Sequence, residues 1–279
     1  MKTLQKRMVR IMLWDSHMHT SFSSDCDIAP EDMIASAIAK GLDGITFTDH
    51  MDLDYWVAPD MFQLDLPAYY KKMSKLKEDY KDNISFQIQV GVEIGLQPHL
   101  AKRVDEALAP YDFDYVIGSS HIVHKIDPYF PQYYDNRTED SAYLEYFESI
   151  LENLETCHNF DSYGHLDYVV RYGPNKDRYY SYNKFSDIID AILHELIHQD
   201  KAMEVNTGAF RCGLLHPNPT EDIIKRYHEL GGRLLTLGAD AHKTEHVGLC
   251  FDQVPELLHA CGFHEYTIYK NRKPIFYPI

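Results

Sequence analysis

The sequence predicts an α/β protein whose parallel strands form a closed or nearly closed barrel, followed by a C-terminal β-hairpin. Two observations support this fold class. Short apolar runs rich in β-branched residues alternate with longer helical patterns along the 279 residues, as in βα units around a parallel sheet. No Gly/Ser-rich linker, internal repeat or change of composition interrupts the alternation, so we expect one domain spanning residues 1–279.

Seven apolar segments are predicted as the parallel strands. They cover residues 11–17, 44–50, 84–93, 115–121, 161–167, 202–207 and 233–240. A proline with acidic residues after it opens the predicted helices at 30–40 and 219–231, and a glycine ends each of them. The longest helical pattern covers residues 182–199. The pattern changes at 265–279, where apolar residues on both sides of Asn271 predict the terminal hairpin.

Composition and charge limit the classes of partner. The 27 Lys and Arg residues against 43 Asp and Glu give a net charge of −16, which repels duplex DNA and anionic membranes. We therefore expect neither a nucleic-acid nor a membrane partner, whereas metal ions or a few arginines could still bind a small anion. The five cysteines include no CxxC pair, which favours a reducing cytoplasm. The chain shows neither an export signal nor 18 consecutive apolar residues, and it leaves the oligomeric state open.

Nearly every predicted strand ends in a residue type that binds metal ions. These residues are His17, His19, Asp49, His50, Glu93, His121, His165, Glu204, Asn206, Asp240 and His242. Because the carboxyl ends of the strands surround one mouth of a parallel barrel, we expect the side chains to converge there. One histidine at a strand end is more often structural, but six histidines at five strand ends indicate a site for several metal ions.

The order of these residues resembles the PHP (polymerase and histidinol phosphatase) metallohydrolases, and within that family most closely the histidinol-phosphate phosphatases. The resemblance spans nearly the whole chain. Its motifs are DSHMHT at 15–20 with SSD at 23–25, TDH at 48–50, GVE at 91–93, GSSH at 118–121, GHLD at 164–167, EVNT at 204–207 and GADAH at 238–242. Any one motif is weak evidence, whereas seven in the same order are specific.

The resemblance implies a distorted (β/α)7 TIM-like barrel that holds three divalent ions of zinc, manganese or iron. The implied ligand sets are His17, His19, Glu93 and Asp240 for the first ion; Glu93, His121 and His165 for the second; and Asp25, His50 and His242 for the third. Some family members have a histidine in place of Asp25, and the harder oxygen donor in this chain leaves the identity of the third ion open.

The resemblance also implies roles in catalysis. Glu93 would bridge two ions, and Asp240 would pass a proton to the leaving oxygen. His242 is the alternative proton carrier if it does not bind the third ion. Arg171 and Arg211, which follow the fifth and sixth predicted strands, suit bidentate binding of a phosphoryl group.

The implied activity is hydrolysis of the small phosphomonoester L-histidinol phosphate to L-histidinol and phosphate, a step of histidine biosynthesis. One alternative keeps the fold and changes the substrate to nucleotides, nucleic-acid ends or phosphotyrosine. Another is a catalytically silent module that binds metal for structure, against which the complete ligand sets argue.

Two further patterns are explained by packing rather than by function. Residues 194–198 match the HExxH pattern of zinc proteases, but the isoleucines and leucines of 188–197 form the buried stripe of an amphipathic helix. His194, Glu195 and His198 should therefore lie on its outer face. Tyrosines such as Tyr129 could line a pocket for a flat ring, although packing explains most of the 21 tyrosines.

Overall fold

A parallel barrel is the central element of the fold. The computed structural model describes residues 12–279, so the first eleven residues of the expected domain lie outside the described residues. Seven strands follow one another in the order β1-β2-β4-β5-β6-β7-β8, and the short strand β3 pairs with β4 as well. The strands are β1 (Trp14–Asp15), β2 (Gly44–Phe47), β3 (His50–Met51), β4 (Gln87–Gly95), β5 (Tyr115–Ser119), β6 (Ser162–Tyr163), β7 (Ala202–Asn206) and β8 (Leu235–Gly238).

Backbone hydrogen bonds between the first and last strands close the barrel. Ser16 N donates to Leu237 O at 2.9 Å, and His19 N donates to Ala241 O at 2.9 Å beyond the strand ends. Every strand pair within the barrel is parallel. The predicted distorted (β/α)7 barrel is therefore confirmed.

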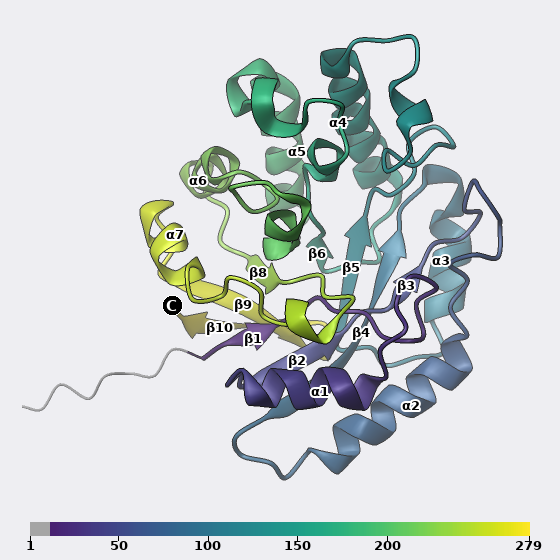
Figure 1. The fold of residues 1–279 in the computed structure, drawn as a ribbon, viewed down its shortest axis with the longest axis vertical. Helices are drawn as coiled ribbons and strands as arrows, with labels where there is room; N and C mark the ends of the chain where they lie inside the picture. Colours follow the sequence, from purple (N-terminus) through teal and green to yellow (C-terminus); the bar gives the residue numbers. More distant parts are fainter. Residues whose placement is uncertain (1–11) are drawn as a thin grey trace, which may run out of the picture.

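Helices surround the strands on the outside (Figure 1). They are α1 (Pro30–Ala39), α2 (Leu66–Asp79), α3 (Ala101–Leu108), α4 (Glu139–Thr156), α5 (Ser186–His198), α6 (Glu221–Glu229) and α7 (Val254–Ala260). None of the helices in this described part of the chain has both the length and the apolar character needed to cross a membrane.

The longest helix lies elsewhere than the sequence predicted. It is α4, with 18 residues, whereas the segment predicted at 182–199 contains the 13-residue α5 after a separate 3-10 turn at Tyr182–Lys184. Helix α4 begins where the Thr138 hydroxyl accepts a hydrogen bond from Ser141 N, with acidic residues in the first turn. Its buried face contains tyrosines as well as aliphatic residues, which made its apolar period less visible in the sequence.

The terminal hairpin is confirmed and closes the end of the barrel where the strands begin. Strands β9 (Glu265–Lys270) and β10 (Lys273–Pro278) pair antiparallel around Asn271 and Arg272. Both turn residues have positive φ, as a two-residue hairpin turn of the primed type requires. Arg272 N donates to Asp114 O just before β5, so the carboxyl ends of the strands remain open at the opposite mouth.

Candidate metal centre

The predicted ligands converge at the carboxyl ends of the strands. His17 and His19 follow β1, His50 begins β3, Glu93 lies within β4, and the remaining ligands follow β5, β6 and β8. Asp25 reaches the same centre from the loop before α1: its Oδ2 lies 3.1 Å from Nε2 of His242. All nine predicted ligands therefore meet in one region.

Glu93 is the middle of this cluster and is fully buried. Its Oε1 lies 3.0 Å from Nε2 of His165 and 3.3 Å from Nε2 of His121. Its Oε2 lies 2.9 Å from Nδ1 of His50 and 3.2 Å from Nε2 of His17. One carboxylate thus faces imidazoles from four separate strand ends, which is the geometry expected of a bridging ligand.

Asp240 is a second carboxylate that contacts several side chains of the cluster. Its Oδ1 lies 3.5 Å from Nε2 of His19 and 3.4 Å from Nδ1 of His242. Its Oδ2 accepts a hydrogen bond from Nη1 of Arg171 at 2.8 Å. Asp240 is therefore shared between the imidazole cluster and an arginine.

The contacts within the cluster fit a metal centre better than a hydrogen-bonded network. Nε2 of His17 and Nε2 of His19 face each other at 3.1 Å. Glu93 Oε2 and His50 Nδ1 are buried and lack a hydrogen bond of proper geometry, although they lie 2.9 Å apart. Buried polar atoms are nearly always partnered, and imidazole nitrogens with carboxylate oxygens are donors suited to zinc, manganese or iron. These residues fit divalent transition-metal ions.

Among residues 12–279, three compact groups of ligand atoms occur, each within 4.8 Å. They are His17, His19 and Asp240; His50, Glu93 and His121; and His19, His50 and His242. The first lies within the set expected for the first ion. The other two each mix expected sets, because His50 also approaches Glu93 and the His19 ring stacks on those of His50 and His242 with centroids 4.1 Å apart.

Electrostatics keep the two central carboxylates charged. Burial raises the pKa of Glu93, but the neighbouring His17, His121 and His50 outweigh it and hold the pKa well below its usual value. The pKa of Asp240 is lowered in the same way, since Arg211, Arg171 and His17 outweigh the effect of burial. Burial and nearby imidazoles lower the pKa of His19, which favours the neutral ring that binds metal ions.

The two predicted arginines line the same cavity but differ in accessibility. The Arg211 side chain is 20% exposed, and its Nη2 lies 3.3 Å from Asp240 Oδ1. The Arg171 side chain is 1% exposed, and three of its N–H groups are engaged with Asp240, Asn206 and Asn218. Arg211 therefore has the better access to a ligand.

A cavity of about 380 Å³ opens beside the cluster. Its ligand-bearing side includes Asp25, His50, His121 and Asp240. Its aromatic side consists of Tyr55, Phe62, Tyr129, Phe130, Tyr168 and Tyr172. Asp127 lies among these rings and is buried, and it accepts hydrogen bonds from the Tyr55 hydroxyl at 2.8 Å and from Tyr129 N at 2.7 Å. The cavity thus combines the metal-type ligands with a wall for a flat organic group.

Sequence reasoning missed Asp52 and Asp127. Asp52 contacts His121 Nδ1 at 3.0 Å, and its position two residues after His50 on the same strand face is a signal that could have revealed it. Asp127 lies in a loop, where no period relates it to the ligands. The HExxH residues are confirmed as outer: His194 and His198 are exposed, and Glu195 accepts a hydrogen bond from Gln199.

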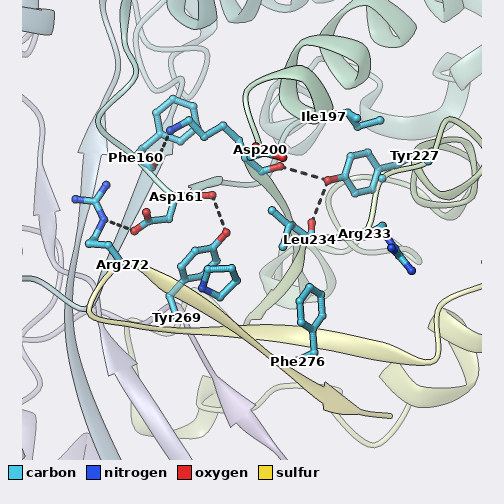
Figure 2. A pocket seen from close by; sticks show the side chains of 14 residues that line it. Phe160, Asp161, Ile197, Asp200, Tyr227, Arg233, Leu234, Tyr269, Arg272 and Phe276 are labelled. Carbon is cyan, nitrogen blue, oxygen red and sulfur yellow. Dashed lines mark hydrogen bonds and ion pairs between the residues drawn. The ribbon is translucent and has the colours of Figure 1, made fainter.

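A second hollow, of about 610 Å³, lies at the opposite end of the barrel beside the hairpin (Figure 2). Its polar groups are largely engaged with protein partners. Arg272 donates to Asp161 at 2.5 Å, and the Tyr227 and Tyr269 hydroxyls donate to backbone carbonyls. No histidine lines this hollow among the described residues, so the metal-type chemistry belongs to the other mouth.

The fold and this cluster define a class of protein: parallel barrels with a multinuclear metal centre at the carboxyl ends of their strands. The PHP domain family model matches residues 15–208. The chain belongs to this family.

Individual relatives cover nearly the whole chain. A histidinol-phosphatase from Lactococcus lactis is 32% identical over 93% of this chain and 95% of its own length. A probable histidinol-phosphatase from Clostridium acetobutylicum is 34% identical over 95% of this chain and 97% of its own length. The crystal structure of the histidinol phosphate phosphatase from Lactococcus lactis, complexed with zinc, L-histidinol and phosphate, superposes with a TM-score of 0.85. That structure is 31% identical in sequence and covers 94% of this chain and 98% of its own.

Proposed function

We propose that this protein is a metal-dependent phosphomonoesterase that hydrolyses L-histidinol phosphate to L-histidinol and phosphate. The observation that carries the proposal is the position of Arg211. It lines the same cavity as the histidine and carboxylate cluster and the aromatic wall. The whole-length similarity to histidinol-phosphatases, one of them solved with zinc, L-histidinol and phosphate, supports the same substrate.

The nine ligand residues would hold three divalent ions of zinc, manganese or iron in the sets that family resemblance implies. Glu93 would bridge two of the ions, as its contacts on both carboxylate oxygens suggest. When bound, such ions neutralise the phosphoryl oxygens and make water nucleophilic near neutral pH.

The chain's own residues would position the phosphoryl group and move the proton. Arg211 matches two phosphate oxygens with its planar guanidinium, and Arg171 supports it by holding Asp240. Asp240 is ionised, so it can take a proton from the attacking water and return it to the leaving oxygen. His242 contacts Asp25 like a ligand, so we assign the proton transfer to Asp240 rather than to His242.

The aromatic side of the cavity would select the leaving group. Flat rings such as Phe62 and Tyr168 favour stacking with an imidazole ring. Asp127 places a carboxyl among these rings and would attract a cationic alcohol such as L-histidinol over an anionic or neutral one. Phosphotyrosine also carries a flat ring and an ammonium group, but it carries an α-carboxylate as well, which Asp127 would repel.

A panel of phosphomonoesters tests this function. Protein reconstituted with zinc, manganese or iron is assayed for phosphate release from L-histidinol phosphate, mononucleotides, phosphotyrosine and 5′-phosphorylated oligonucleotides. We expect the highest kcat/KM for L-histidinol phosphate, and Asp240→Asn prepared in the same way controls for contaminating phosphatases. A higher kcat/KM for any other member of the panel would refute the substrate assignment.

Two wider expectations accompany this function. All five cysteines are free, which supports a reducing compartment, and we propose the cytoplasm. We also propose that residues 1–279 form a single domain whose partner is a small phosphomonoester rather than nucleic acid.

A further inference from the structure

Two buried carboxylates outside the predicted ligand sets lie directly behind ligand histidines. Oε1 of Glu204 lies 2.7 Å from Nδ1 of His17. The two carboxylate oxygens of Asp52 lie 3.0 and 3.1 Å from Nδ1 of His121. We call Glu204 and Asp52 the outer carboxylates.

Each outer carboxylate also approaches a second ligand histidine. Oε2 of Glu204 accepts a hydrogen bond from the backbone N of His165 at 2.8 Å. Oδ2 of Asp52 lies 3.6 Å from Nδ1 of His50. Glu204 therefore touches residues from the first and second ligand sets, and Asp52 touches residues from the second and third.

Glycines provide the space that these carboxylates occupy. A Cβ atom on Gly238 would lie 2.3 Å from Oε1 of Glu204, and a Cβ atom on Gly95 would lie 1.7 Å from Oδ1 of Asp52. A side chain at either glycine would therefore displace the carboxylate from this position. The backbone beside each outer carboxylate thus depends on a residue without a side chain.

The contacts determine which nitrogen of each imidazole carries the proton. An ionised carboxylate only accepts hydrogen bonds, so Nδ1 of His17 and Nδ1 of His121 must donate. Nε2, the other nitrogen of each ring, faces Glu93 at 3.2 and 3.3 Å. An ion bound there would take the Nε2 lone pair and leave the ring proton on Nδ1, beside the outer carboxylate. That is the tautomer and orientation that a metal ligand requires.

We propose that Glu204 and Asp52 are positioning residues that hold His17 and His121 in the metal-binding tautomer and thereby raise the affinity of the centre for its ions. This inference rests on the proposed metal centre but not on the identity of the substrate. Outer partners of this kind change metal affinity by about 10–100-fold in other proteins. We expect an effect of that size here.

The test uses substitutions that separate orientation from simple loss of a buried charge. Glu204→Ala and Asp52→Ala remove the acceptor, whereas Glu204→Gln and Asp52→Asn keep a neutral oxygen that can still accept from Nδ1. Gly95→Ala displaces Asp52 without changing any charge. The matched control is Asp114→Ala, because Asp114 is a buried carboxylate on the hairpin side of the barrel that accepts from Lys77 at 2.6 Å.

Two readouts do not depend on catalysis. Long-range ¹H–¹⁵N NMR spectra of zinc-loaded protein report which nitrogen of each histidine carries the proton, and competition with a chelator reports the affinity for zinc. We expect the Nδ1–H form of His17 and His121 in the wild type and a shift toward the other tautomer in the alanine variants. Zinc affinity should fall about 10–100-fold in these variants, less in the Gln and Asn variants, and comparably in Gly95→Ala.

One outcome would overturn the proposal. If the alanine variants bind zinc as tightly as Asp114→Ala and keep the wild-type tautomers, the outer carboxylates do not position the ligands. An alanine variant that fails to fold is replaced by Glu204→Met or Asp52→Leu, which fill a similar volume without an acceptor. Wild-type zinc affinity and tautomers in that replacement have the same meaning. Because neither readout involves a substrate, a wrong substrate assignment would leave the outcome unaffected.

Discussion

Nη1 of Arg171 donates a hydrogen bond to Oδ2 of Asp240 at 2.8 Å, and both side chains are almost fully buried. The same guanidinium donates to Asn206 and Asn218. A buried charge pair with further hydrogen bonds resists the removal of one partner, because the other charge is left without compensation.

Arg171→Ala should therefore destabilise the protein as well as impair catalysis. We expect the free energy of unfolding to fall by about 3–5 kcal/mol, measured by denaturant titration of metal-free protein. Arg178→Ala, which removes an exposed arginine from a neighbouring turn, is the control and should cost less than about 1 kcal/mol. A similarly small loss for Arg171→Ala would show that the pair contributes little.

Arg211→Ala should mainly weaken phosphate binding. Hydrogen bonds to a charged group contribute about 1.5–3 kcal/mol, so kcat/KM should fall by about one to two powers of ten while the metal content is unchanged. Arg211→Lys should restore only part of the loss, because an ammonium cannot match two oxygens with a planar fork. An unchanged kcat/KM in Arg211→Ala would exclude Arg211 as the phosphate ligand and move attention to Arg171.

Glu93→Gln should abolish most activity, whereas Glu195→Gln should have little effect. Glu93 contacts imidazoles on both of its oxygens, while Glu195 belongs to an outer helix and contacts Gln199. Steady-state kinetics of the two variants, prepared with the same metal, make the comparison. Equal losses would revive the HExxH interpretation.

Metal content provides a direct test of the ligand sets. Protein purified without chelators should contain more than one equivalent of transition metal by elemental analysis, because three groups of ligand atoms are present. Chelation should remove activity and lower the melting temperature, since bound ions stabilise only the folded state. Full activity in a metal-free sample would refute the mechanism.

Asp127→Asn should change selectivity more than reactivity. The substitution keeps the size of the side chain and removes the charge that would attract a cationic leaving group. We expect kcat/KM for L-histidinol phosphate to fall by about tenfold, an effect equivalent to roughly 1.4 kcal/mol, while kcat/KM for phenyl phosphate changes by less than about twofold. Equal losses on both substrates would assign Asp127 a structural role.

The barrel and its ligand-bearing mouth follow from the sequence by itself. Strand-forming runs that alternate with helical patterns indicate a parallel sheet, and when that sheet closes into a barrel the strand ends share one mouth. Residues such as His17, Glu93 and Asp240 could therefore be predicted to meet although they are far apart in the chain. Helix α4 could not be predicted as the longest helix, because buried tyrosines obscure its apolar period.

Only the tertiary structure decided which polar residues share a partner. In the sequence, Arg171 and Arg211 both follow a predicted strand and both suit phosphate binding. In the structure, Arg171 is enclosed by Asp240 and two asparagines, while Arg211 remains open to the cavity. The pairing of Glu204 with His17 joins residues 187 positions apart in the chain. Periodicity indicates the face of a strand to which a side chain belongs, whereas distance and burial across strands depend on how the barrel closes. That closure placed the outer carboxylates behind their histidines and Asp127 within the aromatic wall.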